Sequence, residues 1–213
     1  LLMPTVENES FVAGEDENTA AGYRSAFRTE TEEATPGYYK VELDDYHIKA
    51  ELTATPRAAM HRYTFPQSDR ASILIDLSHG LGDHSTDCTL KALDSRTVVG
   101  YRRSSGFVEN HWYYFCARFS KPFEELYSWE DEKISQASDV RGTAVKFRLN
   151  FKTQEGEEIL IKVGLSTVSE EGARKNLDKE IADWDFEGLD NIYLGLLTKP
   201  DDFRYSDAEL RKL

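Results

Sequence analysis

Long hydrophobic runs are missing from this sequence of 213 residues. No apolar stretch approaches the roughly 20 residues that a membrane-spanning helix needs. The N-terminal residues Leu1-Leu2-Met3-Pro4 also lack the basic region followed by a hydrophobic one that marks a signal peptide. We therefore expect neither a membrane anchor nor a signal peptide, although a mature chain after export, or a piece of a longer chain, has the same appearance.

Positive charge is scarce. Lysine and arginine total 26 against 39 aspartates and glutamates, which gives a formal net charge of −13. Proteins bind nucleic acid largely by neutralising its phosphates with basic side chains, and an anionic membrane leaflet repels a negative surface. The charge balance therefore argues against nucleic acid and against a membrane as partners.

Cysteine is scarce as well, since the chain has only Cys88 and Cys116. Each lies in a segment that reads as a β-strand, which allows either one disulfide or two buried thiols. A chain of this length buries roughly 70% of its unfolded surface and needs no covalent staple. The sequence therefore favours buried thiols.

Motifs for catalysis or metal binding are also missing. No serine lies in a Gly-x-Ser-x-Gly elbow, and with 39 carboxylates a pair of acids for glycoside chemistry can be chosen anywhere. The densest group of possible metal ligands is His79, Asp83, His84 and Asp87 in one glycine-containing loop. Its spacing matches no established site, so a solvated turn between strands is the favoured interpretation.

What the sequence has in plenty is alternation of apolar and polar residues, which is typical of half-buried β-strands. Two hairpins show it best: residues 38–54 turn at Asp44-Asp45, and residues 145–165 turn at Gln154-Glu155-Gly156. The second hairpin is expected to have one buried face and one wet face. Further strands are expected at residues 71–77, 86–93, 97–103 and 111–119, and a loop or edge segment at 123–133.

The period becomes helical after Ser169. Ala173, Leu177, Ile181 and Trp184 recur at spacings of four, four and three, which makes one apolar stripe on a helix. Ser169 is suited to cap the start of that helix, and acidic residues follow it in the first turn.

These patterns predict an all-β fold, mainly an antiparallel β-sandwich, with one C-terminal α-helix. Four segments are expected: an irregular lead-in over residues 1–37, a β-sandwich core over 38–166, a helix over 167–188 and a loosely attached tail over 189–213.

Aromatic residues gather in the expected strand 111–119. Trp112 and Tyr114 lie on one face of that strand, opposite Tyr113 and Phe115. A sheet that presents aromatic rings can stack sugars or another domain, but large aromatics more often supply a core. The sequence favours the core and leaves a contact surface open.

Several segments, in order along the chain, carry a family resemblance. They include residues 1–5, 22–27, 114–123 and 163–181, and above all Gly37-Tyr38-Tyr39-Lys40-Val41-Glu42-Leu43, Ile48-Lys49-Ala50-Glu51-Leu52-Thr53-Ala54-Thr55-Pro56-Arg57 and His61-Arg62-Tyr63-Thr64-Phe65-Pro66. Together these segments resemble the N-terminal domain of glycoside hydrolase family 92, whose members are calcium-dependent exo-acting α-mannosidases.

The resemblance implies a β-sandwich that packs against a separate (α/α) barrel domain. In the family the catalytic acid, the base carboxylates and the calcium site belong largely to that barrel, and nothing resembling it follows in this sequence. We therefore assign no catalytic residue and no metal ligand to this chain, expect calcium only in the barrel, and expect the chain to be inactive alone. The candidates for the substrate pocket or for the interface with the barrel are Tyr23, Arg24, Phe27, Trp112 and Tyr114.

The resemblance also implies α-mannoside glycans as substrates of the whole enzyme, and a secreted, periplasmic or cell-surface location. An alternative is a stand-alone carbohydrate-binding or protein-interaction module, which the strand content and the aromatics Trp112, Tyr114, Tyr127 and Trp129 support. Without the family's first strands and the barrel, a sheet edge and an apolar patch are expected to be exposed, which predicts self-association.

Overall fold

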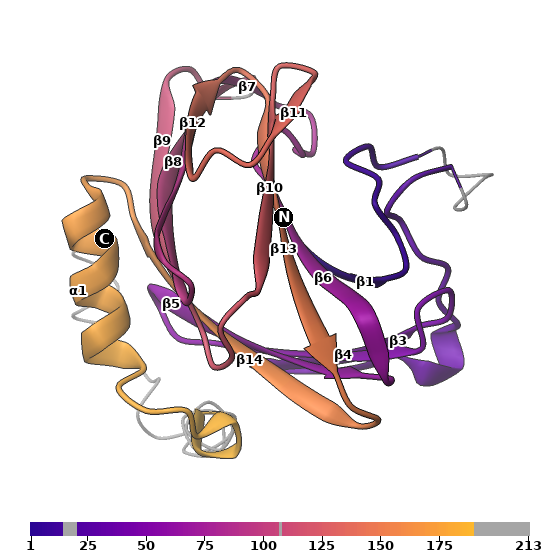
Figure 1. Ribbon diagram of the computed structural model, residues 1–213. Coiled ribbons are helices and arrows are strands. Elements are labelled where there is room, and N and C mark those ends of the chain that lie inside the picture. The colour runs from indigo at the N-terminus through magenta and orange to yellow at the C-terminus, as the bar shows by residue number, and fades with distance from the viewer. Residues whose placement is uncertain (15–20, 107, 190–213) are drawn as a thin grey trace, which may run out of the picture.

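The computed structural model describes residues 1–14, 21–106 and 108–189. In this part of the chain two antiparallel sheets, one of nine strands and one of five, pack face to face, and the α-helix Glu170–Glu180 lies on the outside of the larger sheet (Figure 1). The predicted fold class, an all-β sandwich with one C-terminal helix, is confirmed.

The smaller sheet has the strand order β1-β6-β13-β10-β11. Its strands are β1 (Leu2–Val6), β6 (Ser68–Asp76), β13 (Val145–Thr153), β10 (Glu125–Glu130) and β11 (Lys133–Ser135). Neighbours along this sheet are mostly far apart in the sequence, so its pairing depends on long-range contacts.

The larger sheet has the order β12-β7-β8-β9-β14-β5-β4-β3-β2 and bends around the smaller one (Figure 1). Its strands are β12 (Asp139–Gly142), β7 (His84–Asp94), β8 (Thr97–Ser105), β9 (His111–Phe119), β14 (Glu157–Ser166), β5 (Ala58–Phe65), β4 (Ile48–Ala54), β3 (Tyr38–Leu43) and β2 (Glu33–Thr35), and a short 3-10 helix, η2 (Thr29–Thr31), precedes β2.

The main core lies between the two sheets, where the period of two points every second side chain inward. Phe147, Leu149 and Phe151 of β13 are at most 1% exposed and lie opposite residues of β6 in the same core. The turn between β13 and β14 uses Gly156 at φ +73°, a conformation that glycine adopts at little cost. The hairpin predicted over residues 38–54 is confirmed by the pairing of β3 with β4. The hairpin predicted over residues 145–165 is wrong: both strands and the turn between them are present, but β13 pairs within the smaller sheet and β14 within the larger one, so the chain crosses between the sheets at this turn.

Part of the outer face of β13 is buried, so the prediction of a wet face is wrong at Lys146 and Arg148, although Lys152 on the same face is exposed. Lys146 and Arg148 are 8% and 7% exposed because the segment before residue 14 crosses over them. Lys146 Nζ donates to the carbonyl of Phe11 at 2.6 Å, and Arg148 donates to the carbonyl of Glu9. Alternation along one strand cannot reveal that a remote segment covers its polar face.

Helix α1 (Glu170–Glu180) begins as predicted, because the Ser169 side chain accepts a hydrogen bond from the Gly172 amide at 3.0 Å. Ala173 and Leu177 are fully buried against the larger sheet. The helix ends earlier than the predicted stripe: Ile181 is its C-cap, and Trp184 lies beyond it, 37% exposed. Lys162 of β14 donates to the carbonyl of Ile181 at 3.2 Å and so satisfies part of that helix end.

Three further sequence predictions are settled. The lead-in expected to be irregular contains β1, β2 and η2, and the segment 123–133 expected as a loop or edge contains β10, which pairs on both sides. These strands are short or acidic and depend on their partners.

Cys88 and Cys116 are free and buried, on opposite faces of the larger sheet. The tail predicted for residues 189–213 lies outside the described residues except for Leu189.

Candidate functional site

A groove of about 490 Å³ lies at the N-terminal end of β1, beside the segment that leads to η2. Tyr23, Arg24 and Phe27 all line this groove, so the structure brings the three sequence candidates together. Phe27 is 53% exposed, whereas Tyr23 is 2% exposed and belongs to its floor. The other lining residues are Leu1, Met3, Ser25, Ala26, Leu43 and His79.

Tyr23 is held in place by Asp76, the last residue of β6. Its hydroxyl donates to Asp76 Oδ2 at 2.8 Å, and Lys146 Nζ lies 3.0 Å from the same oxygen. Burial and the neighbouring Asp76 charge raise the pKa of Tyr23, so the phenol remains a neutral donor. Burial acts to raise the pKa of Asp76, but hydrogen bonds from Ser78 and the Lys146 charge outweigh it, and the pKa lies below its ordinary value.

This arrangement has a chemical consequence for the groove. Asp76 Oδ1 accepts from the amide and the hydroxyl of Ser78 at 2.7 and 2.6 Å, and Oδ2 accepts from Tyr23 and Lys146. Its lone pairs are therefore occupied, and Asp76 is suited to hold the floor of the groove rather than to take a proton from a substrate.

A second hollow of about 330 Å³ opens between the two sheets next to the groove, and Leu1 lines both. Most of its wall is apolar, with inward side chains of β5, β6, β9 and β14. Two polar side chains, His61 and Arg102, face it. We name this hollow the inter-sheet cleft.

His61 and Arg102 present polar atoms to an apolar wall. His61 Nδ1 lies 2.9 Å from the Tyr63 hydroxyl, and burial lowers the pKa of His61 to about 4, so the imidazole is neutral at pH 7. Arg102 donates from Nε to the carbonyl of Leu77 at 2.8 Å and from Nη1 to Asp83 at 2.5 Å. Its Nη2 is buried without a hydrogen-bond partner among the described residues.

A third hollow of about 520 Å³ continues the cleft toward the start of α1 and shares Tyr113 and Leu165 with it. Tyr113 and Leu165 are 40% and 44% exposed, and Val168 on the same rim is 80% exposed. Groove, cleft and third hollow thus form one band, which we call the open end of the sandwich. The alternation of residues 145–165 predicts that Leu165 points toward the core. Its exposure could not be predicted, because it depends on how the two sheets pack around the cleft.

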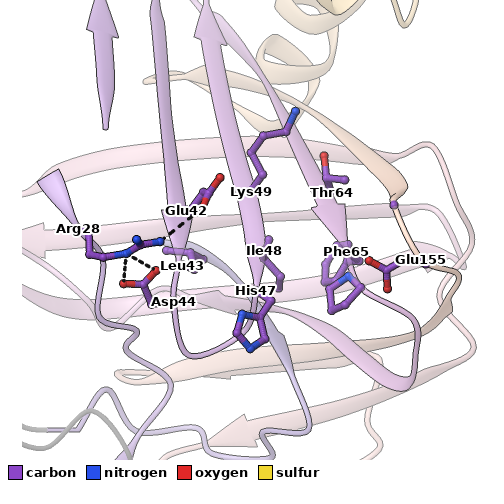
Figure 2. Close-up of a pocket in the computed structure, with 12 residues that line it drawn as sticks. Arg28, Glu42, Leu43, Asp44, His47, Ile48, Lys49, Thr64, Phe65 and Glu155 are labelled. Carbon is purple, nitrogen blue, oxygen red and sulfur yellow. Dashed lines mark hydrogen bonds and ion pairs between the residues drawn. The ribbon is translucent and has the colours of Figure 1, made fainter. Parts of the chain in front are cut away.

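A separate pocket of about 240 Å³ lies at the turns joining β3 to β4 and β13 to β14 (Figure 2). Its charges are paired: Arg28 lies 3.1 Å from Asp44 and 3.7 Å from Glu42, as the dashed lines in Figure 2 show. Lys49, on the same wall, lies 3.0 Å from Glu51. None of the five sequence candidates lines this pocket, and these charged side chains are engaged with one another in ion pairs.

Trp112 and Tyr114 lie away from the open end. They project from the outer face of β9, whereas Tyr113 between them lines the inter-sheet cleft. Both rings are partly buried. The structure therefore divides the five candidates into two places: Tyr23, Arg24 and Phe27 in the groove, and Trp112 and Tyr114 on the opposite side of the larger sheet.

No group of three or more His, Cys, Asp or Glu side chains among the described residues is arranged to hold a metal ion. In the loop with the most possible ligands, Asp83 binds Arg102 at 2.5 Å and Asp87 binds Arg141 at 2.8 Å. The turn interpretation of that loop fits these pairings.

Comparison with known proteins agrees with the fold and with the family resemblance of the sequence. The Glycosyl hydrolase family 92 N-terminal domain model matches residues 1–166. A family 92 α-mannosidase from Bacteroides thetaiotaomicron is 34% identical and superposes with a TM-score of 0.90, over 93% of this chain and 28% of that chain. An inverting family 92 mannosidase from the same species, at 24% identity, shares the fold with a TM-score of 0.74, over 91% of this chain and 25% of that chain.

Among curated proteins, an uncharacterized secreted glycosidase from Arthroderma benhamiae is 27% identical over 180 residues, which are 72% of this chain and 23% of that protein. The chain therefore spans about a quarter of the length of these relatives. Within the described residues, the one α-helix found is neither long nor apolar enough to cross a membrane.

Proposed function

Because this chain belongs to glycosyl hydrolase family 92 as its N-terminal domain, we propose that it serves the hydrolysis of α-linked mannosides by presenting its open end to a catalytic (α/α) barrel domain. The observation that carries the proposal is the open end itself: a concave, largely apolar band that includes Leu165 and Val168, both unusually exposed for apolar side chains. Exposed apolar patches of this kind mark interaction surfaces.

The groove is the part of the open end proposed to face the sugar. Tyr23 forms a rigid part of the floor because Asp76 and Lys146 fix its hydroxyl and its ring. Phe27 and Arg24 stand on the rim, where an aromatic ring is suited to pack against the apolar face of a pyranose. These side chains position substrate and exclude water, and the proton transfers belong to carboxylates of the barrel.

The inter-sheet cleft is proposed as the docking surface for the barrel. Neutral His61 and the guanidinium of Arg102 offer polar contacts inside an otherwise apolar wall. A small number of polar groups within an apolar interface fixes the orientation of the partner. Calcium, when present in the enzyme, is proposed to be held by the barrel, and the substrates are α-mannoside glycans outside the cell.

A chimeric enzyme tests this proposal. The full chain would replace the N-terminal domain of the Bacteroides thetaiotaomicron α-mannosidase, and release of mannose from an α-linked mannobiose would be followed with calcium. We expect activity from the chimera and none from this chain alone. Calcium-dependent mannose release by the chain alone would overturn the proposal, and so would a chimera that melts cooperatively but remains inactive.

The substitution Leu165→Lys in the same chimera probes the docking surface. A charge placed in the open end must be desolvated on docking, so we expect at least partial loss of activity. Lys175→Ala, on the exposed side of α1, is the matched control and is expected to keep full activity.

A further inference from the structure

A cluster of three aromatic rings lies on the outer face of the larger sheet, on the neighbouring strands β8 and β9. Tyr101 comes from β8, and Trp112 and Tyr114 come from β9. The ring centroids of Tyr101 lie 5.2 Å from Trp112 and 5.6 Å from Tyr114. Trp112 and Tyr114 are 5.9 Å apart, with ring planes within 11° of each other. We call these three residues the aromatic platform.

The platform is not explained by packing in a core. Trp112 and Tyr101 belong to none of the three buried clusters of the described residues, and only Tyr114 touches the cluster beneath α1. All three rings are partly exposed. Large aromatic side chains that contribute little to a core are common at binding surfaces, where one face stays accessible.

Polar groups stand around the platform. The Tyr101 hydroxyl donates to Asp87 at 2.8 Å, and Arg141 holds the same carboxylate through two hydrogen bonds of 3.0 and 2.8 Å. The Arg103 guanidinium lies 5.3 Å from the centre of the Trp112 ring. Arg103 Nε is buried and has no hydrogen-bond partner among the described residues.

The polar groups of this rim suit a hydroxylated occupant. Arg141 and Asp87 neutralise each other, so a cation has to break a bidentate pair to reach Asp87, and Arg103 adds one positive charge from which a hydroxyl oxygen can accept a hydrogen bond. A sugar has no such cost, because its hydroxyls both donate and accept and its C–H face is apolar. The guanidinium of Arg103, which lies over the Trp112 ring, has several N–H donors, and such a hydroxyl can accept from one that faces solvent.

We propose that Tyr101, Trp112 and Tyr114 form a second carbohydrate-binding surface, which takes a pyranose ring of a glycan on its aromatic face and its hydroxyls on Asp87 and Arg103. This surface lies on the outer face of the sheet, whereas the groove proposed to face the sugar undergoing hydrolysis lies at the open end. It goes beyond the proposed function because it requires neither the barrel nor catalysis.

The test is binding of a linear α-linked mannotriose to the full chain, measured by calorimetry and by tryptophan fluorescence. We expect binding in the millimolar range, weakened about tenfold or more by Trp112→Ala, since each 1.4 kcal/mol is a factor of ten. Trp184→Ala, which removes another partly exposed tryptophan outside the platform, is the matched control and is expected to bind like the parent chain.

Equal affinity of Trp112→Ala and the parent chain would overturn the proposal, as would the absence of binding at millimolar mannotriose. A cooperative thermal melt checks that each variant is folded. If Trp112→Ala instead abolished self-association without any sugar binding by the parent chain, the surface would be assigned to a second protein copy and the proposal would fail. The chimera measures hydrolysis, so a failure there leaves this result untouched.

Discussion

The hydroxyl of Tyr23 and the carboxylate of Asp76 meet at 2.8 Å although 53 residues separate them in the chain. Their hydrogen bond joins the lead-in segment to the end of β6 and closes the floor of the groove. The same carboxylate accepts from Lys146 of β13, so one buried anion connects three distant segments.

Tyr23→Phe is expected to lower the free energy of unfolding by about 1–3 kcal/mol, because it leaves a buried carboxylate with one donor fewer while the ring is kept. Phe27→Ala is the control: its side chain is 53% exposed, and such surface changes stay within about 0.5 kcal/mol. Urea unfolding of both variants makes the measurement. Equal stability of the two would contradict the anchoring role of Tyr23.

Glu51 makes stability depend on pH. It is 3% exposed on the larger sheet, and burial alone would raise its pKa, but hydrogen bonds from Arg62, Lys49 and Tyr38 hold the pKa at about 2. The ordinary value is 4.5, so this stabilisation is complete above pH 5 and is lost as the pH falls toward 2.

We expect the loss from Glu51 to be on the order of 2–3 kcal/mol, since one pKa unit corresponds to about 1.4 kcal/mol. Glu51→Gln removes this titration, so its stability should fall less steeply between pH 5 and pH 2 than that of the parent chain. Denaturant melts across that range make the comparison, and parallel curves would rule out the assigned role.

Gly164 sets the distance between β14 and α1. A β-carbon added there would lie 2.2 Å from the carbonyl oxygen of Ala173 and 2.7 Å from Cβ of Leu177. Gly164→Ala is therefore expected to push the helix away and to cost about 1–3 kcal/mol. Lys175→Ala, on a side chain that is 74% exposed, should change stability by less than about 0.5 kcal/mol. Thermal melts decide whether the two variants differ.

The two thiols should be inert in the folded chain. Burial raises the pKa of Cys88 to about 11 and also raises the pKa of Cys116, so neither carries a thiolate at pH 8. Ellman's reagent is expected to detect no thiol under native conditions and both thiols in guanidinium chloride. A thiol yield that rises only after prior reduction would indicate a disulfide instead.

The open end predicts self-association of the isolated chain. Leu165 and Val168 expose apolar surface there, and the formal charge of −13 opposes association at low ionic strength. We expect sedimentation velocity to show dimers or larger species that increase with protein and salt concentration, because salt screens the repulsion. Leu165→Lys should shift the distribution toward monomer, whereas a monomeric parent chain at every concentration would contradict the prediction.

Local pattern alone determined much of this protein. Alternation in residues 38–54 specified the hairpin of β3 and β4. Alternation in residues 145–165 specified the strands β13 and β14, but not that they belong to different sheets. Ser169 with Ala173 and Leu177 specified the start and buried face of α1. These features depend on residues that are close together in the sequence, so their periodicity can be recognised within one segment. The family resemblance likewise rests on contiguous residues.

Only the tertiary structure decided which surfaces have partners. The cover that Phe11 and Glu9 provide for Lys146 and Arg148, and the contact of Tyr23 with Asp76, join residues from 53 to 139 positions apart. Short strands such as β1 and β10 gain their stability from neighbours rather than from their own pattern. The open end depends on how the two sheets pack, because residues of both line its cleft. The groove and the aromatic platform are separate because their side chains lie on different faces of the larger sheet.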